Sequence, residues 1–151
     1  MRQNNKILLS EDASGIATVT WNQPAIHIAF DEKLVIKLTD IFTSIGQNED
    51  IRVMVLAAAG KSFSAGANLN WMRRMASYSY EQNLADANVL ANMFFILNTI
   101  DKPTIARVQG AAFGGAVGLI ACCDMAIGSK LSKFCLSEVK LGLAPATISP
   151  Y

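Results

Sequence analysis

The chain contains 151 residues, of which 52% are hydrophobic, so it is long and apolar enough to form one compact domain with a core. Thirteen basic side chains nearly balance twelve acidic ones, and the formal charge of +1 gives no basic footprint for nucleic acid or an anionic membrane. No apolar run approaches the ~18 residues of a membrane span, and the first residues lack the apolar centre of a signal peptide. These features predict a soluble, cytoplasmic protein that binds neither nucleic acid nor membrane.

The first third of the chain alternates between strand and helix patterns. Residues 7–9 and 15–21 predict two strands joined by a turn, because they are rich in β-branched and aromatic residues. Apolar side chains then recur with helical spacing from Asp31, the predicted N-cap, to Gly46, the predicted stop. Residues 51–58 form a short, almost uninterrupted apolar run, which is typical of a strand buried on both faces.

The same alternation continues to the end of the chain. A small-residue loop at 60–68 precedes one helix from Leu69 and a longer helix at 81–100. The side chains that we expect to face inward on the longer helix are Leu84, Ala87, Ala91, Phe94 and Leu97. The later elements are a strand at 104–109, a glycine-rich turn opening a helix that runs through Cys123, strands at 125–127 and 134–136, and a turn at 144–151 that enters another helix. Strands that alternate with helices predict an α/β domain with a mostly parallel sheet.

Two loops built from small residues are the candidates for chemistry. Lys61 to Leu69 and Gln109 to Leu119 each follow a predicted buried strand, and the second opens a helix. Small residues let a ligand approach the backbone, and N–H groups at a helix start can stabilise an oxyanion. Each loop alone is a weak signal, because glycine at a helix start usually reflects packing, and residues 114–118 match neither a dinucleotide-binding nor a Walker pattern.

Together, the motifs resemble those of the enoyl-CoA hydratase/isomerase (crotonase) superfamily, and the match covers nearly the whole chain. The segments that carry it are Ile16-Ala-Thr-Val-Thr-Trp-Asn-Gln-Pro24, Phe63-Ser-Ala-Gly-Ala67, Lys102-Pro-Thr-Ile-Ala106, Gln109-Gly110, Gly114-Gly115, Cys123-Asp124 and Phe134-Cys-Leu-Ser-Glu138 through Leu141-Gly-Leu143. The sequence around Gly115 and Glu138 is most similar to that of bacterial methylglutaconyl-CoA hydratases. The resemblance implies a crotonase-type spiral of ββα units, with residues 1–151 as the N-terminal, acyl-CoA-binding portion. It further implies a C-terminal helical part beyond this chain and assembly as homotrimers or dimers of trimers.

The resemblance also implies the site residues. The N–H groups of Ala67 and Gly115 would form the oxyanion hole, and Glu138 would be the catalytic carboxylate. The coenzyme A moiety of an acyl-CoA thioester substrate would lie along two segments: Ala25, Ile26 and His27, and Ser64, Ala65, Gly66, Ala67, Asn68 and Leu69. No metal is implied, and no cofactor beyond the coenzyme A of the substrate.

Gly118 is the most important departure from the family pattern, since many hydratases carry a second glutamate there. Asn68 and Ala116 replace an aspartate and a glycine of the usual motifs. The leading hypothesis is hydration of a branched 2-enoyl-CoA, similar to 3-methylglutaconyl-CoA. A Δ3-Δ2-enoyl-CoA isomerase needs only one carboxylate and is the first alternative, and a non-catalytic acyl-CoA-binding homologue is the second.

Several side chains have a structural interpretation beside the functional one. Without the family motif, Glu138 reads as a surface carboxylate. His27 is more often a packing or surface residue than a base, and Asp124 is better explained as a structural hydrogen-bonding group. Trp71 and Met72 fit the core as well as they fit an acyl-chain cover.

Two further sets of residues also allow a functional and a structural interpretation. Arg73 or Arg74 could pair with a carboxylate at the far end of a glutaconyl-type substrate, although adjacent arginines usually form a solvated surface. Cys122, Cys123 and Cys135 lack metal-ligand spacing and lie among apolar residues, so we expect buried, free thiols of a reducing compartment.

Overall fold

The computed structural model describes residues 6–26 and 29–151. The elements, in chain order, are β1 (Ile7–Glu11), β2 (Ile16–Trp21), the 3-10 turn η1 (Pro24–Ile26), β3 (Ala29–Phe30), α1 (Glu32–Gln47), β4 (Val53–Ala58), β5 (Gly66–Ala67), α2 (Leu69–Met75), α3 (Tyr80–Asn98), β6 (Thr104–Val108), β7 (Ala111–Phe113), α4 (Gly115–Ala121), β8 (Met125–Gly128), β9 (Lys133–Cys135) and the 3-10 turn η2 (Ser137–Leu141).

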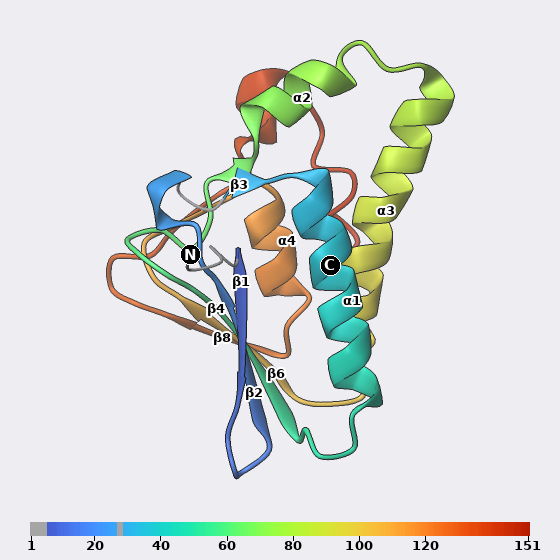
Figure 1. The fold of residues 1–151 in the computed structure, drawn as a ribbon. Coiled ribbons are helices and arrows are strands. Elements are labelled where there is room, and N and C mark those ends of the chain that lie inside the picture. The colour runs from blue at the N-terminus through green and yellow to red at the C-terminus, as the bar shows by residue number, and fades with distance from the viewer. Residues whose placement is uncertain (1–5, 27–28) are drawn as a thin grey trace, which may run out of the picture.

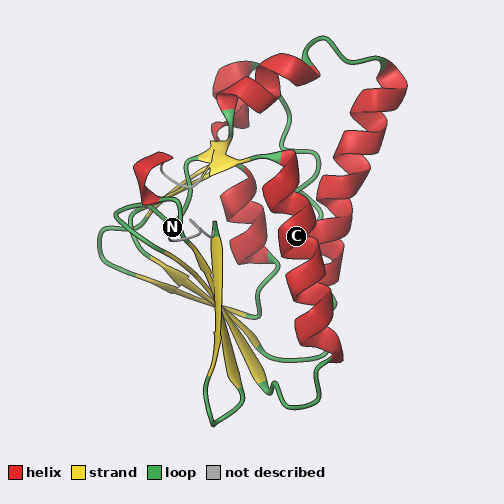
Figure 2. Cartoon of the chain, viewed as in Figure 1, coloured by secondary structure: helices red, strands yellow, loops and turns green. Residues whose placement is uncertain are grey.

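The main sheet has five strands in the order β1-β2-β4-β6-β8. The hairpin β1–β2 is antiparallel, whereas the other three pairings are parallel. Two small parallel sheets, β3–β5 and β7–β9, lie beyond one end of the main sheet. The α/β architecture with a mostly parallel sheet, predicted from the sequence, is confirmed. Figures 1 and 2 show α1, α3 and α4 together on one side of the main sheet.

Helix α1 begins where the sequence predicts and ends slightly later. The Asp31 carboxylate accepts from the N–H of Leu34 at 2.8 Å and from Lys6 Nζ at 2.9 Å. Burial by itself would raise the pKa of Asp31, but the Lys6 ammonium and the Leu34 N–H together hold that pKa below its usual value. The prediction that Gly46 stops the helix is wrong: α1 runs to Gln47 with Asn48 as its C-cap, so Gly46 is an ordinary helical residue.

Helix α3 is only partly inward-facing. A capping box at Ser79 and Gln82, which the sequence reading missed, fixes its first turn. Phe94 and Leu97 are fully buried, as predicted, and Met93 joins them. The prediction that Leu84 faces inward is wrong, because Leu84 is 47% exposed. In Figure 1 the N-terminal part of α3 extends past the N-terminal end of α1, so α1 does not cover the whole length of α3.

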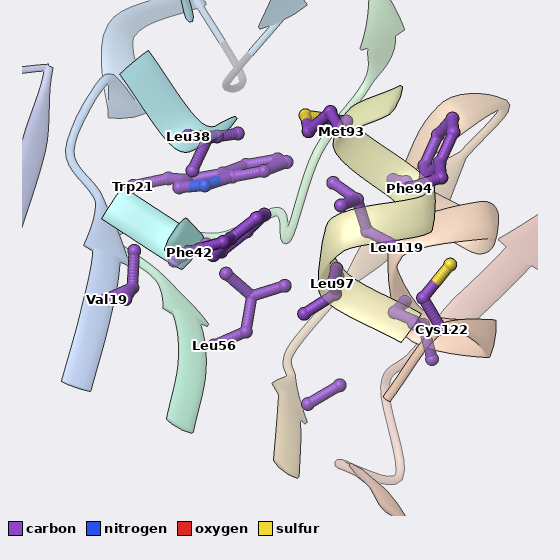
Figure 3. Packing of buried hydrophobic residues seen from close by; sticks show 14 of the residues in the cluster. Val19, Trp21, Leu38, Phe42, Leu56, Met93, Phe94, Leu97, Leu119 and Cys122 are labelled. Carbon is purple, nitrogen blue, oxygen red and sulfur yellow. The ribbon is translucent and has the colours of Figure 1, made fainter. Parts of the chain in front are cut away.

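The core lies between the main sheet and the three helices. Trp21 packs edge-on against Phe30, with ring centroids 5.0 Å apart, and also against Phe63 at 5.6 Å. Figure 3 shows Trp21 beside Leu38 and Phe42, at the boundary between β2 and α1. Because β2 supplies alternate buried side chains to this cluster and β4 supplies Leu56, the register of the central strands is fixed by their apolar pattern.

The cysteines are free, as the sequence predicts, but the predicted burial holds fully for one of them. Cys122 is buried, whereas Cys123 and Cys135 are partly buried. Burial raises the pKa of the Cys122 and Cys123 thiols to about 12, so neither is a thiolate at neutral pH. In Figure 3, Cys122 lies beside Leu119 in the apolar cluster. Among the helices of the described part of the chain, none is long and apolar enough to cross a membrane.

Asp124 links β6 to the segment that follows α4. Its carboxylate accepts from the N–H of Thr104 at 2.7 Å and from the Thr104 hydroxyl at 2.9 Å, and its own N–H donates to that hydroxyl. The two hydrogen bonds from Thr104, led by the backbone N–H, lower the pKa of Asp124. The structural interpretation of Asp124 is therefore confirmed.

We expect Asp124→Ala to lower the free energy of unfolding by about 1–3 kcal/mol at pH 7, because it leaves the buried Thr104 N–H without its acceptor. The pKa of Asp124 is depressed in the folded state, so its contribution is present above the ordinary carboxylate pKa. It is then lost as the pH falls through the lower folded pKa. Denaturant unfolding of parent and variant from pH 7 to below about pH 4 measures the effect.

Asp101→Ala is the matched control, since Asp101 is an exposed carboxylate in the turn before β6. This control should change the free energy of unfolding by less than about 0.5 kcal/mol. If the parent and Asp124→Ala differed in free energy of unfolding by the same amount at every pH down to below about pH 4, the assigned role would be contradicted.

Candidate active site

The two candidate loops of the sequence lie side by side because backbone hydrogen bonds join them. The N–H groups of Phe63 and Ser64 both donate to the Ala111 carbonyl, at 2.8 and 3.0 Å. Phe113 N–H returns a bond to the Ser64 carbonyl at 3.0 Å. Residues 63–64 of the first loop therefore run parallel to β7, the strand that leads into the second loop.

Gln109 and Gly110 secure the base of the first loop. The Gln109 side-chain amide donates to the Ala58 carbonyl at 2.7 Å, and longer contacts reach the carbonyls of Gly60 and Ser62. Gly110 has a positive φ of 65°, and a Cβ there would overlap the Lys61 carbonyl oxygen. A residue with a side chain at 110 would therefore force the loops apart.

Ala67 presents its N–H away from the neighbouring strand. In the parallel pair β3–β5, Ala67 is opposite Phe30, and the next residue, Asn68, donates its N–H to the Phe30 carbonyl at 2.7 Å. Successive N–H groups along a strand point in opposite directions, so the Ala67 N–H points away from β3. Gly66 lets this strand approach the other loop, because a Cβ at its φ of 91° would come 3.1 Å from the Phe113 carbonyl oxygen.

The pairing of β7 with β9 brings Gly115 and Glu138 together. Phe113 is opposite Cys135 in this parallel ladder, and the Gly114 N–H donates to the Cys135 carbonyl at 2.9 Å. Just beyond the two strand ends, α4 begins at Gly115 and η2 carries Glu138. As the first residue of α4, Gly115 has an N–H without an intrahelical acceptor.

Gly114 makes room for the glutamate. Its backbone has a φ of 56° and a ψ of −126°, a conformation that favours glycine. A Cβ on Gly114 would come 3.0 Å from Glu138 Oε1. The other carboxylate oxygen, Oε2, is buried and has no hydrogen-bond partner among the described residues. A buried acceptor of this kind is available for a group that enters the site.

Ala67, Gly115 and Glu138 line the same cavity, which has a volume of about 280 Å³. Its other walls are mainly small or apolar and come from both loops, α2 and η2: Ala65, Met72, Phe113, Gly114, Ser137, Lys140, Leu141 and Leu143. Apolar walls with a few convergent polar groups are typical of small-molecule sites.

A second, smaller cavity of about 100 Å³ is lined by the same three residues. Its remaining wall residues are Phe30, Trp71, Leu90, Thr147 and Ile148. Ala67, Gly115 and Glu138 therefore lie between the larger and the smaller cavity.

The predicted cover residues divide between the two cavities. Met72 lines the larger one, whereas Trp71 is only 4% exposed and lines the smaller one. The indole Nε1 of Trp71 is buried without a hydrogen bond of good geometry among the described residues. The Asp86 carboxyl lies nearby: burial raises the pKa of Asp86, and the indole N–H offsets part of that increase. Trp71 is therefore both a core residue and a cavity wall.

The residues predicted to lie along coenzyme A have different surroundings. Ala65 lines the larger cavity, but Ser64 is fully buried and its hydroxyl accepts from the Gly66 N–H at 3.2 Å. Asn68 is the N-cap of α2, with its side chain accepting from the N–H groups of Asn70 and Trp71, and Leu69 begins that helix. Ser64 and Asn68 therefore shape the loop itself.

The other predicted coenzyme A segment lies in and after η1. Ala25 is exposed, and neither cavity includes it among its wall residues. The segment approaches the base of the first loop, since a Cβ on Gly60 would come 2.8 Å from Pro24 Cβ. Ile26 ends η1, and His27 lies outside the described residues.

The structure does not bring the predicted arginines to the site. Arg74 Nη2 pairs with the Glu32 carboxylate at 2.7 Å, and Arg73 Nη1 donates to the Asn70 side chain at 3.0 Å. The positive charge in the wall of the larger cavity belongs instead to Lys140. Its position two residues after Glu138, in the same turn, was the available signal. No group of three or more metal-ligating side chains was found in the described part of the chain.

A family model described as enoyl-CoA hydratase/isomerase matches residues 11–150. A solved enoyl-CoA hydratase from Shewanella pealeana is 48% identical, with a TM-score of 0.95, over 99% of this chain and 56% of that protein. A Legionella pneumophila structure described as enoyl-CoA hydratase/isomerase (crotonase) is 47% identical, with a TM-score of 0.93, over 97% of this chain and 56% of that protein. A curated enoyl-CoA hydratase of Alternaria alternata is 33% identical over 91% of this chain and 44% of its own length.

The chain belongs to the enoyl-CoA hydratase/isomerase family, because the family model covers almost all of it. The expected crotonase-type fold is also confirmed by the two solved structures. The chain spans about half the length of these relatives.

Proposed function

We propose that the protein is an enoyl-CoA hydratase whose site is formed by Ala67, Gly115 and Glu138. The observation that carries the proposal is that these three residues border both cavities, although they come from three separate segments. A Cβ on Gly115 would make only ordinary contacts, the closest at 3.6 Å to Phe30. Packing alone therefore does not demand glycine, and its absent side chain leaves the N–H open to a ligand.

In the proposed reaction, the thioester carbonyl oxygen accepts hydrogen bonds from the N–H groups of Ala67 and Gly115. These bonds strengthen as the oxygen gains charge, so they stabilise the enolate more than the bound substrate. Water forms a bond to C3, the π electrons move toward C2 and the carbonyl, and Glu138 takes a proton from water and delivers one to C2. The carboxylate is regenerated, so no other acid or base is required.

A branched acyl chain with a terminal carboxylate, similar to 3-methylglutaconyl-CoA, is the substrate class that we propose. Lys140 supports this choice, because it places a positive charge in the wall of the larger cavity beside apolar side chains. The homotrimer or dimer of trimers and the cytoplasmic location are further proposals. The first rests on the family resemblance, and the second is supported by the three free cysteines, which suit a reducing compartment.

A Δ3-Δ2-enoyl-CoA isomerase is the second candidate, and Gly118 favours it. Moving one proton between C2 and C4 needs Glu138 and the oxyanion hole but no oriented water. The family itself includes isomerases in its description.

The test is mass spectrometry of the products that the complete encoded polypeptide forms from matched 2-enoyl- and 3-enoyl-CoA substrates. We expect the 2-enoyl substrates, including 3-methylglutaconyl-CoA, to gain one water. A shift of the double bond without a change in mass would instead identify an isomerase. Binding without turnover of any substrate would identify a non-catalytic homologue.

A further inference from the structure

Gly118 lies under a residue near the end of the chain that fills the space beside it. A Cβ on Gly118 would come 2.8 Å from the Cβ of Ile148, closer still to its Cγ2, and 3.1 Å from a ring carbon of Phe94. Ile148 is only 7% exposed, so it is fixed in the core. A second carboxylate at 118 is therefore both absent from the sequence and blocked by the packing.

The turn that carries Ile148 is held in position at several points. The N–H groups of Ile148 and Ser149 both donate to the Pro145 carbonyl, at 3.2 and 3.0 Å. The Tyr151 ring lies 6.1 Å from that of Phe94 on α3. Because the residues around it are anchored, Thr147 has a defined place relative to the site.

Thr147 faces the smaller cavity together with Glu138, Ala67 and Gly115. A threonine hydroxyl can donate one hydrogen bond and accept others, as water requires. Glu138 Oε2 is buried without a partner among the described residues, so it can accept from the same water. A cavity of about 100 Å³ has room for a water molecule with polar groups on two sides.

We propose that Thr147 is a positioning residue, whose hydroxyl orients the water that adds to C3 while Glu138 accepts its proton. The inference rests on the proposed hydratase function. It assigns to a neutral hydroxyl the orienting role that a second carboxylate would otherwise have. During hydration, the C3–O bond forms from this water, one water proton passes to Glu138, and Glu138 protonates C2.

The experiment compares two reactions in Thr147→Val and Thr147→Ser variants of the complete encoded polypeptide. The first is hydration of a 2-enoyl-CoA, which needs the oriented water. The second is exchange of the C2 protons of the matching saturated acyl-CoA with D₂O. That exchange breaks and remakes only the C2–H bond, and so uses Glu138 and the two N–H groups.

We expect Thr147→Val to lower kcat for hydration roughly 10- to 100-fold, the order of effect caused by a misplaced reactant. Its KM and its exchange rate should change less than about twofold, because binding and proton transfer do not use the hydroxyl. Thr147→Ser should recover most of the hydration rate. If the valine variant does not fold, Thr147→Ala is compared with Thr147→Ser, because these two variants differ only in the hydroxyl group.

Hydration at the parental rate in a folded Thr147→Val or Thr147→Ala variant would overturn the role of Thr147. Equal losses of hydration and exchange would do the same, because they indicate a general structural effect. If the parent protein exchanges C2 protons but hydrates no 2-enoyl-CoA, the hydratase proposal itself fails, and the water-orienting role fails with it. These results separate the failure of the inference from the failure of the function on which it rests.

Discussion

Glu138→Gln is expected to lower kcat for enoyl-CoA hydration by about 10²- to 10⁴-fold, the range typical of the loss of a general acid–base group. Glutamine keeps nearly the same volume over Gly114, but it cannot take a proton from water or give one to C2. The N–H groups of Ala67 and Gly115 are unchanged, so KM for the acyl-CoA should change much less than kcat. Steady-state kinetics of the purified complete polypeptide measures both constants.

Glu49→Gln is the matched control, because Glu49 is an exposed carboxylate in the turn between α1 and β4. It carries the same chemical change and should retain parental turnover. Circular dichroism and thermal unfolding of the Glu138→Gln variant establish that its fold is kept. Near-normal turnover by folded Glu138→Gln would remove Glu138 from the mechanism and return it to the surface-carboxylate interpretation.

Gly118→Ala is expected to lower the free energy of unfolding by about 1–3 kcal/mol, because the new methyl group must displace the β-branched carbons of Ile148. The helix preference of alanine over glycine offsets part of this cost, by up to about 1 kcal/mol. Denaturant unfolding with a common m-value gives the difference.

Gly46→Ala is the same substitution at another helical position, and we expect it to have the opposite effect on the free energy of unfolding. Gly46 lies inside α1, and a Cβ there would have nothing within 4 Å. We therefore expect this variant to gain about 0.5–1 kcal/mol of stability. The pair separates the steric effect at Gly118 from the general helix preference for alanine.

A double-mutant cycle with Ile148→Ala tests the contact directly. Removal of Cγ2 should make the further change Gly118→Ala cost less than it does in the parent, since the two residues are in contact. Equal costs in the two backgrounds would show that Ile148 does not occupy the space over Gly118. In that case the space for a second carboxylate would be open, and the role proposed for Thr147 would lose its basis.

Local patterns in the sequence predicted most elements of this protein. The N-cap at Asp31, the helical spacing of Leu34, Val35, Leu38, Phe42 and Ile45, and the apolar run of β4 are all short-range signals. The end of α1 was less predictable, because a glycine is tolerated inside a helix when its neighbours continue the pattern. Leu84 was misplaced for a different reason: which turns of a helix are covered depends on the neighbouring elements, which is not a local property.

The sequence by itself determined the order and type of the secondary elements, the structural character of Asp124 and, through its motifs, the family. The same motifs named the candidate site residues, which stay a prediction. Only the tertiary structure decided which of these residues meet. The parallel pairing of β7 with β9 places Glu138 beside Gly115, and Lys140, rather than Arg73 or Arg74, supplies the charge in the cavity wall. It also seats Ile148 over Gly118 and places Thr147 in the wall of the smaller cavity with Glu138, although these two pairs are about 30 and 9 positions apart in the sequence. Such contacts depend on the packing of whole elements, whereas sequence patterns report the preferences of neighbouring residues.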